Sequence, residues 1–296
     1  FNIYINIKGV EISNNMKKGN IFCDDILKFS RGVEFGFKSS NVFSERKNEL
    51  YPIINGGNIT RYKINFDKKY VNYDENNFKI YKQKEIYINE KILVRRIATS
   101  IISCYDDLGY FNVCDVYNLQ LKENINNYNL KYIFCVLNSR LLSFYYDVRF
   151  KSVKKLFPKI PIQNLKKLPI KNIPISEQKP FIEKADFMLD KNKTLQEKVN
   201  KFLKRLNENF EIEKMSNKIK SFYNLEFGDF VKELKKKKVV LSLKDQDDWE
   251  EYFLDYKKEI LELKSEIDKC DGEIDEMVFE LYGLDEEERS MVLDVK

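Results

Sequence analysis

One segment near the start of the chain has the residue types of a phosphate-binding loop. In residues 30–40, glycines flank a short apolar core, and Arg31 and Lys38 stand at its two edges. Glycine lets the backbone come close to a ligand, so main-chain amides and the two cations could reach a phosphate together. The alternative is a hairpin whose charges are incidental, and the residue types alone leave both open.

A second segment carries residue types that read bases. Residues 51–62 contain a glycine pair followed by four polar or aromatic candidates, which are Asn58, Thr60, Arg61 and Tyr62. Asparagine recognises adenine and arginine recognises guanine through paired hydrogen bonds in the major groove of DNA, while threonine and tyrosine can contact phosphate or the thymine methyl group. We therefore predict that this turn contacts nucleic acid directly.

Two further segments add cations. In residues 91–97 a short apolar run leads into Arg95 and Arg96, one of which is expected to face the duplex and the other a carboxylate. In residues 149–159 cations alternate with two phenylalanines, which predicts contact with the phosphate backbone. The alternative for this stretch is a solvated connector. Its candidate residues are Arg149, Lys151, Lys154 and Lys155.

Catalytic and metal-binding patterns are missing from the sequence. The chain has no histidine, which excludes Ser-His-Asp and Cys-His nucleophile systems and the histidine-based zinc motifs. The five cysteines are widely spaced and form no CxxC pair, so a zinc ribbon is not predicted. No glycine-rich nucleotide loop is present either. We predict no catalytic residue, no metal site and no bound cofactor in this chain.

Charge is divided unevenly along the chain. Residues 1–175 contain 29 Lys and Arg against 16 Asp and Glu, whereas residues 176–296 contain 23 against 31. A lysine-rich coding bias would raise both parts equally, so the asymmetry indicates that the first part meets a polyanion. No apolar run approaches the roughly 18 residues that a membrane span needs. The chain begins with Phe1 rather than Met, which predicts that it is part of a longer protein.

The elements that must position these candidates are predicted to be mostly β structure up to residue 122. Short strands are expected at residues 1–8, 86–88, 92–94, 101–104 and 110–121, where β-branched and aromatic residues are frequent. The turn signal at residues 106–109 predicts that the last two of these runs form a hairpin.

The remainder is predicted to be mainly helical. Residues 129–148 repeat apolar positions at steps of three and four. Two later stretches have heptad seams, the first through Phe181, Ala185, Met188, Asn192, Leu195, Val199, Phe202 and Leu206, and the second through Trp249, Phe253, Tyr256, Ile260, Leu263, Ile267, Cys270, Ile274, Met277 and Leu281. The seams predict an antiparallel arm or, alternatively, two helices of a small bundle. Gly272 is expected to interrupt the second helix.

Taken in order, these segments resemble the TaqI-like C-terminal specificity domain of type IIG restriction–modification enzymes and N6-adenine DNA methyltransferases. The resemblance runs through Ser30 to Gly36, PIINGGNITRY (52–62), KILVRRI (91–97), GYFNVCDVYNLQL (109–121), LKYIFCVLNSRLLSFYY (130–146), FPKIPIQNLKKLPI (157–170), ISEQKPFIEKADFML (175–189) and EIDEMVFELYGLDEEE (273–288). Each segment is a loose match, and their order and spacing make the set specific.

The resemblance implies an α+β fold in which a mixed, β-rich target-recognition domain (1–175) is followed by a helical spacer with a coiled coil (176–296). It implies sequence-specific recognition of double-stranded DNA without catalysis in this chain. The other implied partners are the methyltransferase and endonuclease domains of the same parent chain. The resemblance also implies a location in the cytoplasm and no association with a membrane. S-adenosylmethionine and Mg²⁺ would be bound by those parent domains, before Phe1.

Other functions remain open from the sequence. One is a stand-alone specificity subunit of the type I kind, although such subunits usually alternate two recognition domains with two helical regions, and this chain has one of each. Another is a protein–protein scaffold built on the heptad helices, with an incidental basic part. A histidine-free carboxylate enzyme acting on nucleic acid is the least favoured. Steeply salt-dependent DNA binding would separate the recognition module and the stand-alone subunit from the scaffold.

Overall fold

A computed structural model describes residues 3–35, 39–47, 49–74, 83–150 and 158–294. The chain forms two compact units, of which the first combines residues 1–186 with 272–296 and the second consists of residues 187–271. Two long helices, α7 (Lys179–Phe210) and α10 (Leu243–Tyr282), have residues in both units.

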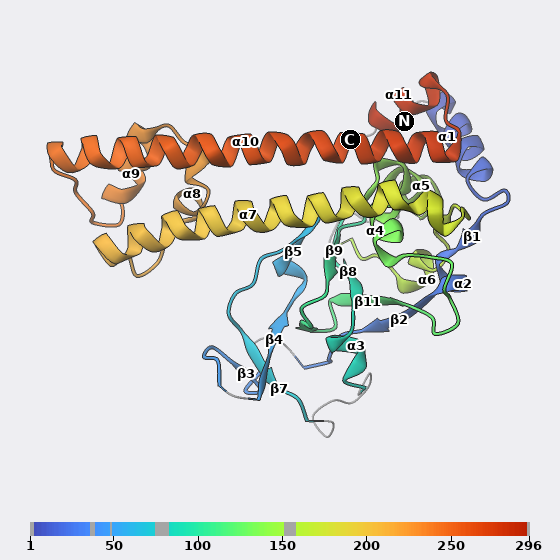
Figure 1. Cartoon of the computed structure of the whole chain (residues 1–296), viewed down its shortest axis with the longest axis horizontal. Helices are drawn as coiled ribbons and strands as arrows, with labels where there is room; N and C mark the ends of the chain where they lie inside the picture. The colour runs from blue at the N-terminus through green and yellow to red at the C-terminus, as the bar shows by residue number, and fades with distance from the viewer. Residues whose placement is uncertain (1–2, 36–38, 48, 75–82, 151–157, 295–296) are drawn as a thin grey trace. The chain divides into compact units, whose positions relative to one another are not determined.

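The first unit is built on a four-stranded antiparallel sheet with the strand order β2-β11-β8-β9 (Figure 1). Its strands are β2 (Leu27–Arg31), β11 (Val116–Leu121), β8 (Lys91–Arg95) and β9 (Ser103–Asp106). Ile92, Leu93 and Val94 are all fully buried in β8. Because successive side chains of a strand point to opposite faces, both faces of β8 are covered. The strand predicted at residues 92–94 is confirmed as a central strand of this sheet.

A second sheet and two small strand pairs adjoin the first sheet. The second sheet has the order β10-β4-β7-β3, and β10 is parallel to β4. Its strands are β10 (Phe111–Asn112), β4 (Leu50–Ile54), β7 (Tyr70–Asn72) and β3 (Val42–Phe43). The small pairs are β5 (Ile59–Thr60) with β6 (Lys63–Ile64), and β1 (Ile21–Phe22) with β12 (Pro169–Ile170).

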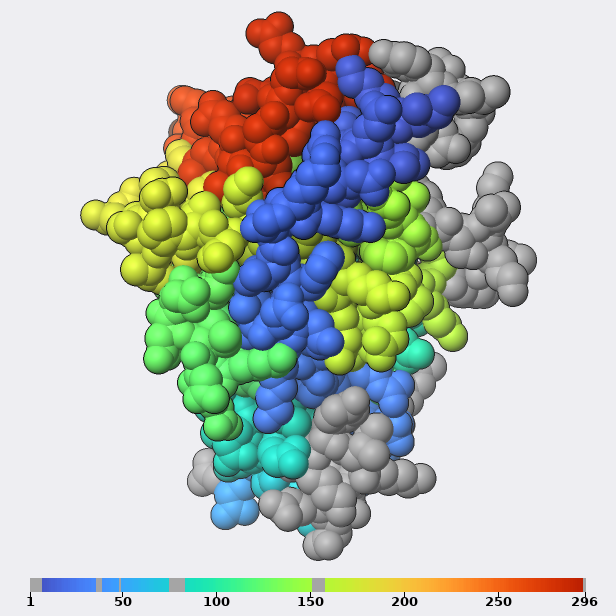
Figure 2. Space-filling view, turned by 90° about the vertical axis from the view of Figure 1, so that its right-hand side faces the viewer, coloured from blue at the N-terminus to red at the C-terminus, as the bar shows by residue number. Residues whose placement is uncertain are grey.

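Helices and helical turns complete the first unit. They are α1 (Ile3–Asn15), α2 (Cys23–Ile26), η1 (Gly56–Asn58), α3 (Glu85–Ile88), α4 (Leu130–Asn138), α5 (Arg140–Phe150), α6 (Ile162–Leu165), η3 (Ile175–Gln178) and α11 (Glu286–Asp294). Figure 2 shows the first segment of the chain (blue) between the segment after β11 (green) and the segment around β12 (yellow-green). On the β12 side, this first segment is held by the strand pair between Ile21 and Ile170. On the β11 side, the Lys122 N–H donates to the Ile26 carbonyl at 3.0 Å.

The second unit is a helical assembly around one aromatic core. Its α7 and α10 residues run antiparallel, because Lys191 pairs with Glu266 at 2.5 Å and Lys198 pairs with Glu259 at 2.6 Å. The short elements α8 (Asn217–Lys220), η4 (Phe222–Asn224) and α9 (Phe227–Lys235) pack into the same core. The expected antiparallel pairing is therefore present, together with features of a small bundle. A coiled coil in the strict sense stays a prediction.

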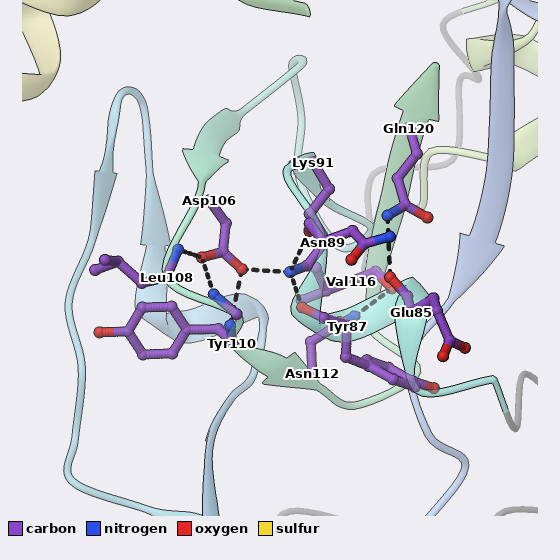
Figure 3. Close-up of polar contacts among 11 residues, drawn as sticks. Glu85, Tyr87, Asn89, Lys91, Asp106, Leu108, Tyr110, Asn112, Val116 and Gln120 are labelled. Carbon is purple, nitrogen blue, oxygen red and sulfur yellow. Dashed lines mark hydrogen bonds and ion pairs between the residues drawn. The ribbon is translucent and has the colours of Figure 1, made fainter. Parts of the chain in front are cut away.

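A buried ion pair joins β8 to β9 inside the first unit (Figure 3). Lys91 and Asp106 are partners in the strand register, their Nζ and Oδ2 atoms are 2.5 Å apart, and both side chains are fully buried. The Lys91 ammonium also donates to the carbonyl of Tyr87, in α3. The Asp106 carboxylate accepts three backbone N–H groups at 2.9–3.1 Å, those of Leu108, Gly109 and Tyr110.

Burial works against both charges of this pair. It lowers the pKa of Lys91 and raises the pKa of Asp106, and in each case the opposite charge of the partner counteracts the shift. The three N–H groups add further stabilisation to the Asp106 carboxylate, since hydrogen bonds to the charged form favour it. We conclude that the ionised pair is kept by its internal partners rather than by water.

Several sequence predictions of local structure are wrong. Residues 3–15 form α1 instead of a strand, because this segment packs against α5, where Arg149 donates to the Val10 carbonyl and the Asn14 side chain. Ile86 and Tyr87 lie in α3, where the Tyr87 ring stacks on Phe111 with centroids 4.4 Å apart. Tertiary packing has overridden the local β preference in both segments.

The predicted hairpin and the predicted break at Gly272 are also wrong. β9 pairs with β8 and β10 pairs with β4, so the turn at residues 106–109 does not join two partner strands. The N–H groups of that turn instead bind Asp106. α10 continues through Gly272, where a Cβ atom would meet nothing within 4 Å. An exposed glycine costs helix stability without stopping the helix.

The α+β organisation itself is confirmed, with the sheets in the earlier part of the chain and the long helices in the later part. The helical prediction for residues 129–148 is also confirmed, although the segment forms two helices, α4 and α5, instead of one. The two compact units describe packing. The division of function between residues 1–175 and 176–296 stays a prediction.

The substitution Lys91→Met should lower the free energy of unfolding by about 3–5 kcal/mol, because it leaves a buried carboxylate without its charged partner. Adding Asp106→Asn to it should cost less than the sum of the two single changes, since the two side chains interact directly. Urea unfolding of the four proteins followed by circular dichroism measures both effects.

The matched control is Lys179→Met, which removes a cation from an exposed pair with Glu183, whose side chains are 77% and 66% accessible. Its effect should stay within about 0.5 kcal/mol. If Lys91→Met unfolds at the same urea concentration as this control, the buried pair does not hold the sheet as described.

Candidate nucleic-acid interface

Three arginines from different segments meet at one end of the four-stranded sheet. Arg31 is the last residue of β2 and Arg95 is the last residue of β8, with Arg96 directly after it. Both strands flank the start of β11, because Arg31 pairs with Tyr117 and Arg95 pairs with Val116 in the register. Burial raises the pKa of the Tyr117 hydroxyl, and the charges of Arg96 and Arg31 oppose this shift, which places both cations near that ring.

A fourth cation joins this end of the sheet from the segment after α5. Lys159 is exposed and forms a strand-like bridge with Ile97, and the N–H of Ile160 donates to the Arg96 carbonyl at 2.9 Å. We call Arg31, Arg95, Arg96 and Lys159 the basic end of the sheet. The antiparallel register thus gathers cations from three of the sequence segments that were singled out for charge.

Each arginine of the basic end is oriented by an internal contact. Arg31 pairs with Glu34 at 3.3 Å, and Arg95 Nε donates to the Ile97 carbonyl at 2.8 Å. Arg96 Nη1 donates to the Cys114 carbonyl at 3.4 Å. A guanidinium has five N–H donors in a fixed plane, so these contacts orient the groups and leave donor capacity for a phosphate.

Asp115 ties the glycine turn of residues 55–58 to the basic end. Its Oδ1 atom accepts the Gly56 N–H at 3.0 Å, and its carbonyl accepts the Arg96 N–H at 2.9 Å. Burial raises the pKa of the Asp115 carboxyl, while the Gly56 hydrogen bond and the charges of Arg95 and Arg96 oppose the shift. Asp115 is therefore a carboxylate near the two arginines, and the sequence did not identify it. That one of these arginines faces a carboxylate stays a prediction, because the side-chain contacts described for Arg95 and Arg96 are with backbone carbonyls.

The segment of residues 55–67, which we call the recognition hairpin after the role that we propose for it below, is shaped by Asn58. This residue is 3% exposed, and its Oδ1 accepts the Asn55 N–H at 2.8 Å. Its Nδ2 donates to the Asn65 carbonyl at 2.7 Å and to Asp67 Oδ2 at 2.8 Å. With both ends of the amide engaged, Asn58 holds the hairpin closed.

Tyr62 and Arg61 anchor the hairpin to α4. Tyr62 is 4% exposed, has a positive φ of 64° and packs edge-on against Phe134 with centroids 5.5 Å apart. Arg61 Nη2 donates to the Asn138 carbonyl at 2.5 Å. Thr60, by contrast, is exposed, and its hydroxyl donates to the Lys63 carbonyl at 3.3 Å.

The remaining sequence candidates do not meet at this place in the part of the chain that the structure describes. Arg149 contacts α1 through Asn14 and Val10. Four of the predicted contact residues, Lys38, Lys151, Lys154 and Lys155, lie outside the described residues. Lys159 and Asp115 were not among the predicted site residues, although Lys159 belongs to the basic stretch and Asp115 to the segment 109–121.

Other kinds of site find little support in the described parts of the chain. No group of three or more His, Cys, Asp or Glu residues there could hold a metal ion. None of the helices described combines the length and the apolar character of a membrane span. A hollow of about 1160 Å³ lies at the opposite end of β2, and its charges are mixed. They come from Asp24, Glu85, Glu90 and Glu123 and from Lys28, Lys122 and Lys166.

Comparison with protein families identifies two segments. Residues 51–170 match the model of the TaqI-like C-terminal specificity domain, and residues 174–278 match a domain of unknown function (DUF8810). The first match contains the recognition hairpin, Arg95, Arg96 and Asp115 and covers 120 of 296 residues. The resemblance derived from the sequence is confirmed for this segment. Residues 51–170 are thus similar to the TaqI-like C-terminal specificity domain.

Two solved structures of specificity subunits are similar to parts of this chain. The S subunit of a type-I restriction-modification system from M. genitalium has 14% sequence identity and a TM-score of 0.42, over 70% of this chain and 48% of that subunit. The HsdS subunit from Thermoanaerobacter tengcongensis has 9% identity and a TM-score of 0.37, over 62% of this chain and 44% of that subunit. This chain therefore spans less than half the length of either subunit. No curated protein matches the chain in sequence.

Gly32 follows Arg31 at the basic end and allows a close approach of two backbone segments. A Cβ atom at Gly32 would lie 2.0 Å from the Asn112 carbonyl oxygen, and this oxygen already accepts the Val33 N–H at 2.8 Å. Gly32→Ala should therefore lower the free energy of unfolding by about 3 kcal/mol, because backbone must move to admit the methyl group.

Gly272→Ala is the matched control, since it adds the same methyl group to an exposed helix with nothing within 4 Å. It should raise the free energy of unfolding by about 0.5–1 kcal/mol. Thermal unfolding of the two variants measures the difference. Equal midpoints would contradict the close contact between Gly32 and residue 112.

Proposed function

We propose that this chain is a sequence-specific double-stranded DNA recognition module. The observation that supports this most directly is the meeting of the recognition hairpin and the basic end of the sheet. The hairpin and three of the four cations, Arg95, Arg96 and Lys159, lie inside the segment that matches a specificity domain. Clustered cations supply sequence-independent attraction to phosphates, and a neighbouring loop can then read base edges. The net positive charge of residues 1–175 is in keeping with this function.

The proposed contacts divide into two kinds. Arg31, Arg95, Arg96 and Lys159 bind phosphates and fix the orientation of the duplex. Exposed groups of the recognition hairpin, Thr60 first among them, face the base edges. Asn58 and Tyr62, which sequence alone suggested as contacts, keep the hairpin in shape. The predicted contacts of Lys38, Arg149, Lys151, Lys154 and Lys155 remain part of the proposal as additional phosphate contacts.

We further propose that the module works within a cytoplasmic type IIG enzyme. In this arrangement residues 1–175 read the target, residues 176–296 form the spacer, and neighbouring methyltransferase and endonuclease domains of the parent chain perform the chemistry. Those domains would bind S-adenosylmethionine and Mg²⁺, while this chain itself binds neither and performs no catalysis. A methyltransferase of this kind has to flip its target adenine out of the duplex, so a fixed position on the DNA is what the module supplies.

A stand-alone specificity subunit of the type I kind is the alternative within the same function. The protein–protein scaffold is the alternative outside it, and the charge distribution argues against it. Of the acidic side chains of α10, Glu259 and Glu266 pair with lysines of α7 within the second unit. Among the residues that the structure describes, the cations of the basic end form no ion pair with a neighbouring helix, and a scaffold function would leave these cations unexplained.

The full chain should retain DNA from a random duplex pool at low salt, and sequencing of the retained DNA should give a short common motif. On that motif Arg95→Ala and Arg96→Ala should each reduce the slope of log K against log salt by about 0.9, the value for one lost phosphate contact. Fluorescence anisotropy at several salt concentrations measures the slopes.

Lys193→Ala is the matched control, because it removes an exposed cation of α7 in the second unit. It should leave the slope as in the unchanged protein. Retention of no duplex at low salt would argue for the scaffold. An unchanged slope in both arginine variants would show that DNA lies elsewhere on the molecule.

A further inference from the structure

Two consecutive helices of the first unit are separated by a single residue, Ser139. Its ψ of 152° ends α4, and its hydroxyl donates to the Val136 carbonyl at 2.7 Å. The same hydroxyl accepts the Leu142 N–H at 3.2 Å and so begins α5. Serine suits this double role because one oxygen can satisfy groups at the end of one helix and at the start of the next.

The residue before this break connects three segments. Asn138 is 1% exposed, and its carbonyl accepts Arg61 of the recognition hairpin at 2.5 Å. Its Oδ1 accepts the N–H of Ser103, the first residue of β9, at 3.3 Å. Its Nδ2 has no hydrogen-bond partner among the described residues. A buried amide that leaves a donor unsatisfied is costly, so its position calls for a reason beyond packing.

The residue after the break is held by a carboxylate from α10. Asp275 is 3% exposed, and its Oδ1 accepts the Arg140 N–H at 2.7 Å. Its Oδ2 lies 3.3 Å from Arg140 Nε. A carboxylate at the first turn of a helix is stabilised by the unpaired N–H groups there, so this contact fixes the start of α5. Neighbouring acids of α10 form pairs that are much more exposed, as Glu273 does with Lys184.

These contacts form a continuous path from α10 to the recognition hairpin. It runs from Asp275 to Arg140, through the Ser139 break to Asn138, and from the Asn138 carbonyl to Arg61. All of these residues lie in the first unit. Asp275 is outside the segment that matches the specificity domain and inside the one that matches a domain of unknown function.

We propose that Asp275 is a positioning residue for DNA recognition, which acts by fixing the α4–α5 break and, through Asn138, the orientation of Arg61 and the recognition hairpin. This inference rests on the proposed DNA-binding function. A residue that reads or orients DNA needs neighbours that lock its geometry, because a small displacement of the contacting group weakens discrimination. Asp275 therefore affects discrimination between DNA sequences, and its loss does not change the phosphate contacts of the basic end.

The test uses the full chain and two DNA probes, a duplex with the selected motif and a duplex with that motif scrambled. Asp275→Ala should reduce the ratio of the two affinities by roughly tenfold. The affinity for the scrambled duplex and its salt dependence should stay unchanged. Asp275→Asn keeps an oxygen acceptor for the Arg140 N–H, so it should recover part of the ratio even if the alanine variant folds poorly.

Two further proteins separate positioning from general destabilisation. Glu280→Ala removes an exposed acid from the same helix and should leave the ratio unchanged. If Asp275 acts through Arg61, then Asp275→Ala in an Arg61→Ala background should have no further effect on the ratio.

The possible outcomes are distinct. If the unchanged chain binds neither duplex, the DNA-binding function fails and this inference fails with it. If the unchanged chain discriminates and folded Asp275→Ala or Asp275→Asn discriminates equally well, only the inference fails. Full additivity of Asp275→Ala and Arg61→Ala would also overturn it, because the path through Arg61 would then not exist.

Discussion

Lys91 and Asp106 place two opposite charges inside the first unit, where neither side chain is exposed to solvent. Each charge is acceptable only because the other is 2.5 Å away and because backbone groups complete the hydrogen bonds of both. The geometry of β8, β9 and α3 is therefore coupled, since a shift of any one of them would leave a buried charge unpaired. The ion pair reinforces the register of β8 and β9, because a slip of one residue would separate Lys91 from Asp106 and leave two buried charges unpaired.

That register decides what happens at the other end of β8. With Lys91 fixed opposite Asp106, the next alternate position on the same face carries Leu93 into the core, and Arg95 reaches the end of the strand. β11 pairs with the same strand and brings Arg31 of β2 to the same end. A buried pair at one end of a five-residue strand thus sets the position of cations at the other end. The residue of the buried ion pair, Lys91, and the proposed DNA contact, Arg95, therefore lie at opposite ends of the same strand.

Sequence reasoning succeeded where the signal is local and failed where it depends on a distant partner. The run around Leu93 is apolar enough to identify a strand, and the charge difference between the parts of the chain identifies the basic part without any structure. The α1 segment was misread because its partner is α5, more than a hundred residues later. Asp115 was missed for the same reason, because a single aspartate reveals neither the glycine turn nor the arginines that it joins.

In α10 the buried face departs from the heptad pattern that the sequence predicts. Its heptad positions up to Ile274 are buried or half-buried, with Phe253, Ile260, Leu263, Cys270 and Ile274 buried. After Ile274 the buried residues of α10 are Asp275, Val278 and Phe279, whereas the heptad positions Met277 and Leu281 are only half-buried. The change occurs where α10 passes from the second unit to the first, so the helix serves two different cores and turns a different face to each. If the heptad pattern continued past this point, Asp275 would be an ordinary exposed residue on the helix surface. The change of face buries Asp275 instead, and this brings a carboxylate of α10 to the break between α4 and α5.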